Sequence, residues 1–317
     1  MEYRRLGSAG VKVSAIGLGG WLTFGNAVGE ETGRDVLARA FDGGINFLDT
    51  ANVYARGACE EMWGRLLVGR TRSDYVLATK VFFAMGDGPN DKGLSRKHIM
   101  EQCHASLRRL KTDYVDVYQC HRFDEETPLE ETVRAMDDLI RQGKALYWGF
   151  SLWPAAEIKR AIALCDARGY TRPVSSQPPY NVIDRQVEPD VIPLCIEQGI
   201  GQVVFCPLAQ GLLTGKYLPG QPPPADSRAA DDRQNAFIAK RLVDDGLLRR
   251  IQSLRPIAEE LGCTMAQLSL AWILHRPGIS SAIIGASKAS QVTDNLRAVD
   301  VALTPDHMAR IDAAIGG

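Results

Sequence analysis

The strongest constraint on the fold is a repeated alternation along the chain of short apolar segments with longer amphipathic ones. The apolar segments have the length of strands, and in the amphipathic segments apolar residues recur three and four positions apart, which is the period of a helix. The unit repeats at intervals of roughly 25 to 35 residues, as strand–helix units of a parallel sheet do. The expected strands are residues 15–18, 46–48, 75–79, 115–119, 146–149, 174–177, 201–205 and 282–284. The clearest helices are residues 31–42, 97–110, 129–142 and 154–167.

About eight strand–helix units in one chain predict an α/β fold, the closed (β/α)8 TIM barrel. Several strands are nearly continuous apolar runs, which indicates burial on both faces. Length alone leaves two average domains open, but barrels of this kind commonly occupy 317 residues as one unit. We therefore expect a single domain over residues 1–317.

Segments at both ends of the chain depart from this repeat. Residues 3–6 and 11–14 flank Gly7-Ser8-Ala9-Gly10 and predict a β-hairpin that plugs the barrel floor. Residues 296–299 and 305–315 follow the last strand and predict extra C-terminal helices.

A further irregular segment, residues 208–235, is rich in Gly, Pro and charge and has no periodicity. Segments this long inside a compact domain are usually functional lids or disordered linkers. Because strand-like residues 203–205 precede it, we favour the lid.

Charge and cysteine usage exclude several classes of protein. Acidic and basic residues nearly cancel, to a net charge of −1, and no basic face is evident, so we expect no nucleic-acid partner. The seven cysteines are scattered without a C-x-x-C pair, which indicates reduced, mostly buried thiols and no metal site. The sequence shows no signal peptide and no apolar run of membrane-spanning length, so we expect a cytoplasmic protein without a membrane partner.

Reactive side chains follow three neighbouring expected strands. Asp49 ends the second strand and Tyr54 follows in the next loop, Lys80 ends the third strand, and His121 ends the fourth. Active sites of β/α barrels lie at the carboxyl ends of the strands, and neighbouring strands are about 5 Å apart. We therefore expect these four side chains to form one catalytic cluster.

This set of groups fits the reduction of a carbonyl. The phenol of Tyr54 has an ordinary pKa near 10, and we expect the cation of Lys80 to stabilise its phenolate. A buried ammonium needs a counter-charge, which is the expected role of Asp49. His121 would hydrogen-bond the substrate oxygen, so that the developing alkoxide is held between phenol and imidazole.

Each of these residues alone also has a structural explanation, because a strand-end Asp often caps a turn, a loop Tyr packs, and a Lys or His pairs locally. The four together favour catalysis. A second enzyme class stays open, since a strand-end lysine such as Lys80 can form a Schiff base with a carbonyl substrate. We expect the remaining histidines at the surface, namely His98, His104, His275 and His307.

The glycine fingerprint of doubly wound dinucleotide-binding folds is absent, because Gly17, Gly19 and Gly20 miss the G-x-G-x-x-G spacing. A different phosphate signal follows the last strand. The segment IIGASKASQVTDN (283–295) has small residues, hydroxyls and Lys288 at a helix start, where backbone N–H groups favour phosphate. An ordinary strand-to-helix turn has similar composition, so the residues alone leave both interpretations open.

The segments GINFLDTANVYARGACEEMWGRLL (44–67), LATK and VDVYQCHRFD (115–124) resemble the aldo-keto reductases, and the resemblance covers essentially the whole chain. Residues 121–151, together with PLAQGLLTGKY (207–217), are most similar to one branch of that family. This branch contains the voltage-gated potassium channel β subunits and bacterial L-glyceraldehyde 3-phosphate reductases.

By that resemblance Asp49, Tyr54, Lys80 and His121 take the four catalytic positions. The channel subunits carry Asn where His121 stands, and histidine is the more usual catalytic residue in the wider family. This difference favours a working enzyme over a channel partner.

The resemblance also implies an NADPH cofactor. Residues matching Gly285, Ser287, Lys288, Gln291 and Asn295 would hold its 2′-phosphate and adenine. Phe205 would stack on the nicotinamide. The nicotinamide and pyrophosphate would lie along Trp21, Asp49, Ser151, Gln177, Pro207, Leu208, Gly211, Lys216 and Arg228. Lys216 and Arg228 would clasp the pyrophosphate, although the same cations, taken alone, are typical of a solvated loop.

Gly20 and Leu152 stand where the channel subunits have Thr and Arg, so some cofactor contacts would differ. Aromatic residues near strand ends are candidates for an apolar substrate pocket, although they are as often plain packing. These candidates are Trp21, Phe24 and Trp153, with Phe82 or Phe83.

We therefore expect NADPH-dependent reduction of an aldehyde or ketone, a small-molecule carbonyl substrate, with Tyr54 as general acid. The alternative is a regulatory subunit that uses bound NADPH as a sensor. Because the expected hairpin begins at the first residues, we expect no long leading segment of the kind that blocks a pore. Relatives in this branch form tetramers or larger rings, so the resemblance implies a homo-oligomer.

Overall fold

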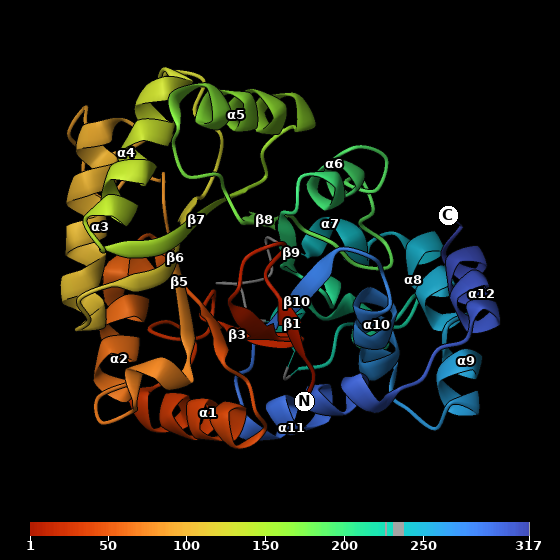
Figure 1. The fold of residues 1–317 in the computed structure, drawn as a ribbon. Coiled ribbons are helices and arrows are strands. Elements are labelled where there is room, and N and C mark those ends of the chain that lie inside the picture. Colours follow the sequence, from red (N-terminus) through yellow and green to blue (C-terminus); the bar gives the residue numbers. More distant parts are fainter. Residues whose placement is uncertain (226, 231–237, 317) are drawn as a thin grey trace.

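A closed barrel of parallel strands forms the centre of the fold (Figure 1). The computed structural model describes residues 1–225, 227–230 and 238–316. Strand β10 pairs in parallel with both β3 and β9, which closes the barrel. The strands are β3 (Ile16–Gly19), β4 (Phe47–Asp49), β5 (Val76–Val81), β6 (Val115–Cys120), β7 (Ala145–Ser151), β8 (Ser175–Gln177), β9 (Gly201–Val204) and β10 (Ile279–Ile284). The predicted (β/α)8 barrel is confirmed.

Helices that follow the strands cover the outside of the barrel (Figure 1). In α4 the apolar positions Val133, Met136 and Leu139 recur every three residues, and all three side chains are buried. The helices are α1 (Glu30–Asp42), α2 (Ala58–Leu66), α3 (Arg96–Leu110), α4 (Leu129–Arg141), α5 (Ala155–Arg168), α6 (Val191–Glu197), α10 (Met265–Leu274) and α11 (Ala289–Leu296). The four helices expected from the sequence, at α1, α3, α4 and α5, are all present.

The N-terminal hairpin of β1 (Tyr3–Arg5) and β2 (Lys12–Ser14) is also present and antiparallel. Its Leu6 and Val13 side chains pack in one buried cluster with residues of the barrel strands. Gly7 has a φ of +61°, and a Cβ there would lie 2.2 Å from the carbonyl oxygen of Gly199, so only glycine fits this close approach. The hairpin therefore closes one end of the barrel, as expected.

The C-terminal residues form η6 (Arg297–Asp300) and α12 (Pro305–Ile315), which confirms the expected extra helices. Figure 1 shows α12 beside α8 (Asp245–Gln252), on the outside of the molecule. Shorter helices complete the chain: η2 (Arg72–Asp74), α7 (Ala239–Leu242) and α9 (Arg255–Glu260).

The irregular segment begins with η3 (Ala209–Thr214), whose Leu212 and Leu213 are buried in the core, and includes η4 (Arg228–Ala230). Its start is therefore anchored rather than free. Residues 226 and 231–235 of the predicted lid lie outside the described residues.

Among the described residues, no helix is long and apolar enough to cross a membrane. The same residues contain no cluster of three His, Cys, Asp or Glu side chains that suits a metal ion. All seven cysteines are free, and five of them are buried. The surface location expected for His98 is wrong, because its position in the first turn of α3 faces inward beside Ile99 and its side chain is only 1% exposed.

Candidate active site

The carboxyl ends of β4, β5 and β6 bring the expected cluster together. Asp49 is the last residue of β4, Lys80 the last but one of β5, and His121 directly follows β6. The backbone N–H of His121 donates to the carbonyl oxygen of Val81 at 2.9 Å, which continues the pairing of β5 and β6 beyond the strand end. The barrel register therefore sets the relative positions of these side chains.

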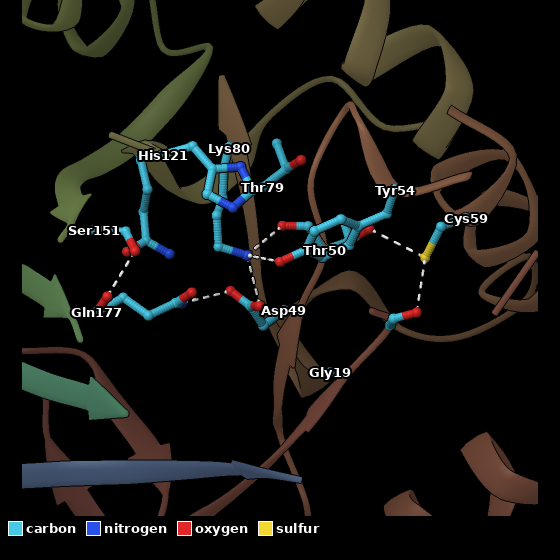
Figure 2. Close-up of polar contacts among 12 residues, drawn as sticks. Gly19, Asp49, Thr50, Tyr54, Cys59, Thr79, Lys80, His121, Ser151 and Gln177 are labelled. Atoms are coloured by element: carbon cyan, nitrogen blue, oxygen red, sulfur yellow. Dashed lines mark hydrogen bonds and ion pairs between the residues drawn. The ribbon is translucent and has the colours of Figure 1, made fainter. Parts of the chain in front are cut away.

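Tyr54 reaches the cluster from a tight turn after β4. It opens η1 (Tyr54–Gly57), in which Ala55 and Arg56 have left-handed φ values of 48° and 51°. Left-handed backbone is unfavourable for residues with a side chain, and such strain occurs preferentially at functional sites. The turn brings the phenol back to the strand ends (Figure 2).

The amine of Lys80 is the centre of the cluster (Figure 2). Its Nζ donates to Asp49 Oδ2 at 2.6 Å, to the carbonyl oxygen of Thr50 at 2.8 Å and to the Tyr54 hydroxyl at 3.1 Å. The Lys80 side chain is completely buried. Burial lowers its pKa, and the adjacent Asp49 carboxylate opposes that shift.

The Asp49 carboxylate is held from its other side as well. Gln177 Nε2 donates to Asp49 Oδ1 at 2.8 Å, and the Ser151 hydroxyl donates to the Gln177 carbonyl oxygen at 2.6 Å. Residues at the ends of β4, β5, β7 and β8 thus form one hydrogen-bonded chain. The sequence placed Ser151 and Gln177 along the cofactor but did not indicate that Gln177 orients Asp49.

His121 is buried, and its Nδ1 has no hydrogen-bond partner among the described residues. The His121 ring makes T-shaped contacts with the rings of Tyr54 and Phe83, at centroid distances of 5.8 Å and 4.9 Å respectively. Burial, and then the charges of Lys80 and Arg122, hold the His121 pKa well below its usual 6.5. The imidazole is therefore neutral at physiological pH and can donate a hydrogen bond through an N–H.

The pKa of the Tyr54 phenol is not lowered, as a neighbouring cation alone would lower it. Burial, and then the nearby Asp49 carboxylate, raise the Tyr54 pKa well above its usual 10.0, although the expected contact with Lys80 is present. Burial is the larger cause, because it disfavours the charged phenolate, and the Asp49 carboxylate adds to it. Tyr54 is consequently a protonated donor over the whole physiological pH range.

A cavity of about 1190 Å³ opens beside this cluster and runs to the start of α11. Most of the residues predicted for the active site and cofactor line it: Trp21, Phe24, Asp49, Tyr54, His121, Ser151, Gln177, Phe205, Pro207, Leu208, Gly211, Lys216, Arg228, Gly285, Ser287, Gln291 and Asn295. Lys80 is not part of the lining, but it contacts Asp49 and Tyr54, which are. The cavity therefore joins residues from eight or more separate segments of the chain.

A second part of the cavity lining, formed by the irregular segment and the start of α11, suits an anionic ligand. The cations of Lys216 and Arg228 lie there on the irregular segment, and Arg228 Nη1 donates to the side-chain oxygen of Gln210. At the start of α11, the backbone N–H of Ser287 donates to Gln291 Oε1 at 2.8 Å. Cations and a helix start that share one cavity lining are a common arrangement for phosphate.

The structure does not bring every predicted residue to the cavity. Trp153 lies in a buried aromatic cluster, stacked on Phe150 at 5.1 Å and edge-on to Phe123 at 5.2 Å, so it packs instead of lining a substrate pocket. Lys288 is exposed at the N-cap of α11, outside the lining. Phe24 touches the cavity but is mostly core, edge-on to Trp63 at 5.4 Å.

Phe83, one of the two alternatives expected for the pocket, lines the cavity, whereas sequence reasoning missed other lining residues, among them Arg122 and Gln210. Arg122 directly follows His121, and this location after a strand end is the signal that could have identified it.

Comparison with known proteins gives consistent results. Residues 15–315 match the Aldo/keto reductase family. A probable voltage-gated potassium channel subunit beta of Arabidopsis thaliana is 47% identical over 99% of this chain and 97% of its own length. Its counterpart of Oryza sativa is 45% identical over the same shares, and a putative one of Schizosaccharomyces pombe is 43% identical over 98% and 92%. The resemblance predicted from the sequence is thus confirmed, and the chain belongs to the aldo/keto reductase family.

Proposed function

We propose that this protein is an NADPH-dependent reductase that converts an aldehyde or ketone to an alcohol, with Tyr54 as the general acid. One observation carries the proposal. A buried amine, that of Lys80, contacts both the Asp49 carboxylate and the Tyr54 phenol, and both partners line the large cavity. Membership of the aldo/keto reductase family supports an oxidoreductase in general.

The residues present fit a nicotinamide dinucleotide. The volume of about 1190 Å³ is sufficient for a large ligand. We propose that Phe205 and Gln177 contact the nicotinamide, that Lys216 and Arg228 bind the pyrophosphate, and that the residues before and within α11 hold the adenosine. When bound, NADPH would supply the hydride that reduces the carbonyl carbon. We propose NADPH over NADH because Lys288, at the α11 N-cap, offers a cation to a 2′-phosphate.

The role of Tyr54 follows from its protonation state. Its raised pKa keeps the phenol protonated, so it can donate its proton to the substrate oxygen as negative charge develops there. Lys80 already donates a hydrogen bond to the phenol oxygen and would stabilise the phenolate that remains. Asp49 and Gln177 fix the amine in that position.

His121 provides the second contact to the substrate oxygen in this proposal. The neutral imidazole has N–H donor capacity without carrying a charge that would compete with the phenol. Its edge-on contacts with Tyr54 and Phe83 fix the plane of the ring. The carbonyl oxygen of the substrate would thus be bound between the Tyr54 phenol and the His121 imidazole.

The Schiff-base alternative is less consistent with the geometry of Lys80. A nucleophilic amine must be neutral and face the substrate. Here the amine is fully buried and donates to three oxygen atoms.

A spectrophotometric screen tests the proposal. NADPH oxidation would be followed with aldehydes, ketones, sugar phosphates and quinones, and NADH would be tested in parallel. We expect oxidation with at least one class of carbonyl and a slower reaction with NADH. Binding of NADPH without consumption in the presence of any carbonyl would contradict the proposed activity.

A second candidate function is a regulatory subunit that binds NADPH and turns over little, because three relatives carry names of potassium channel β subunits. Tight NADPH binding combined with no turnover across the same panel would favour it. By the same resemblance we propose a cytoplasmic homo-oligomer, and a monomeric mass in light scattering would contradict that assembly.

A further inference from the structure

Arg122 belongs to the part of the cavity lining that contains Tyr54, Phe83 and His121, where the proposed reduction would take place. We call this part the carbonyl end. Arg122 directly follows His121 beyond the end of β6, and it lines the cavity together with Tyr54 and Phe83. The side chain is half-buried, so its guanidinium is partly removed from water. Burial lowers the Arg122 pKa, and the charge of Arg122 influences the titration of both Tyr54 and His121. Arg122 is therefore electrostatically close to the groups that would act on the substrate.

Among the residues that the structure describes, the guanidinium of Arg122 has no acidic partner. One of its N–H groups donates to the backbone carbonyl oxygen of His121 at 2.6 Å, and its Cζ atom lies 5.2 Å from the Phe83 ring centroid. No carboxylate within the described parts of the chain forms a salt bridge with it. Most of its five N–H donors are thus available. A half-buried cation without a counter-charge is unfavourable unless a ligand provides one.

The carbonyl end also carries a net positive charge. Asp49, whose carboxylate lines the cavity beside Tyr54, is already neutralised by Lys80. His121 is neutral, which leaves Arg122 as the uncompensated charge among the described residues of this end. The other acidic residue of the described lining, Asp294, lies in α11 and forms no salt bridge with Arg122.

Arg122 is also distinct from the cations assigned to the cofactor. Lys216 and Arg228 come from the segment after β9, whereas Arg122 comes from the end of β6, beside the proposed proton donor. The phosphates of the cofactor therefore do not account for Arg122.

We infer that Arg122 binds an anionic group of the substrate, so that the preferred substrate is a carbonyl compound that also carries a carboxylate or a phosphate. The inference rests on the proposed carbonyl reduction and narrows its substrate class. Guanidinium binds either anion through paired N–H donors, which is why both are included.

The test compares each anionic aldehyde with a neutral counterpart. Succinic semialdehyde would be paired with its methyl ester, 4-carboxybenzaldehyde with its methyl ester, and glyceraldehyde 3-phosphate with glyceraldehyde. For wild type we expect kcat/KM to be about 10- to 100-fold higher for the anionic member of at least one pair. The first two pairs test for recognition of a carboxylate and the third for recognition of a phosphate. Comparison of the pairs therefore shows which of the two anions is preferred.

The decisive variant is R122Q, with R122K and the exposed R134Q on α4 as controls. Because Arg122 also influences Tyr54, the readout is the ratio of kcat/KM for the anionic and neutral substrates, not either rate alone. We expect R122Q to bring this ratio to about one, R122K to retain part of it, and R134Q to leave it as in wild type. Equal rates for anionic and neutral substrates in wild type, or an unchanged ratio in R122Q, would overturn the inference.

A binding measurement separates this inference from the proposed reduction. Calorimetry with saturating NADPH would compare benzoate with benzamide, neither of which can be reduced as an aldehyde. We expect benzoate to bind more tightly than benzamide and R122Q to lose the difference. If benzoate shows this behaviour but no carbonyl is reduced, the anion site stands and the proposed activity fails. If carbonyls are reduced but benzoate and benzamide bind equally, the proposed activity stands and the anion site fails.

Discussion

The two ends of the cavity are built in different ways. At the carbonyl end, the polar groups stand on or next to barrel strands and bind one another, Lys80 to Asp49 and Asp49 to Gln177. At the cofactor end, Lys216 and Arg228 stand on the irregular segment between β9 and α10, and no carboxylate of the described residues pairs with them. The sheet therefore preorganises the groups proposed for chemistry, whereas the cations proposed to bind phosphate have no carboxylate partner within the described ranges.

The largest expected effect comes from removing the proton donor of the carbonyl end. We predict that Y54F lowers kcat about 100- to 10,000-fold, because the substrate oxygen loses its general acid. The Kd of NADPH should change little, since the phenol is not among the cofactor-end groups. Steady-state kinetics and fluorescence titration would measure both, with Y170F as a control that removes a phenolic hydroxyl outside the cavity. Full turnover in Y54F would contradict the assignment.

The internal pairing of the carbonyl end predicts a large effect on stability. D49N leaves the buried Lys80 amine without its counter-charge, and we expect the free energy of unfolding to fall by roughly 3–5 kcal/mol. Urea denaturation would measure it. The exposed Asp166–Arg172 pair is the matched control, and D166N should cost far less because that pair is accessible to water.

The double variant D49L/K80M tests whether the loss of stability in D49N comes from the unpaired charge of Lys80. Because it removes both buried charges, it should recover much of the stability lost in D49N. A loss in D49N no larger than that in D166N would show that the pair contributes little to the fold.

Substitutions at the cofactor end, which contains Lys216 and Arg228, should change the affinity for NADPH rather than the rate of the chemical step. We predict that K216M and R228M each raise the Kd of NADPH about tenfold, because each removes a cation proposed to bind pyrophosphate. The kcat at saturating NADPH should stay within about threefold of wild type. K159M, an exposed lysine on α5, is the control. A loss of kcat without a loss of affinity would contradict the division between the two ends.

The smallest expected effect is that of pH. The His121 pKa lies below 6.5 and the Tyr54 pKa above 10.0, so between these values the imidazole stays neutral and the phenol stays protonated. We therefore predict a kcat/KM for carbonyl reduction that is flat across this window, measured with a neutral aldehyde. A pronounced inflection near pH 8 would mean that another group controls the reaction.

The sequence predicted the carbonyl end well because its residues obey the barrel repeat. Asp49, Lys80 and His121 each follow a recognisable apolar run, and parallel strand ends necessarily meet at one edge. Tyr54 was predicted from its loop, but the raised pKa of its phenol was not. The shift follows mainly from the burial of the phenol, with a contribution from the Asp49 carboxylate, and only the geometry gives that burial.

The cofactor end was predictable mainly through the family resemblance. Lys216 and Arg228 lie in a segment without periodicity, so no pattern of their own placed them at the cavity. Trp153 illustrates the opposite problem, since a strand-end aromatic residue can pack inward on Phe150 as readily as line a pocket. Arg122 was overlooked because its lack of an acidic partner becomes visible only when the surrounding side chains are known.

The most direct test of the central claim uses NADPH deuterated at the transferring C4 position together with an aldehyde substrate. Wild type should produce an alcohol with deuterium on the former carbonyl carbon, detected by mass spectrometry, and Y54F should form it at least about 100-fold more slowly. An alcohol without deuterium, or equal formation by wild type and Y54F, would contradict proton donation by Tyr54 in a hydride-transfer reaction.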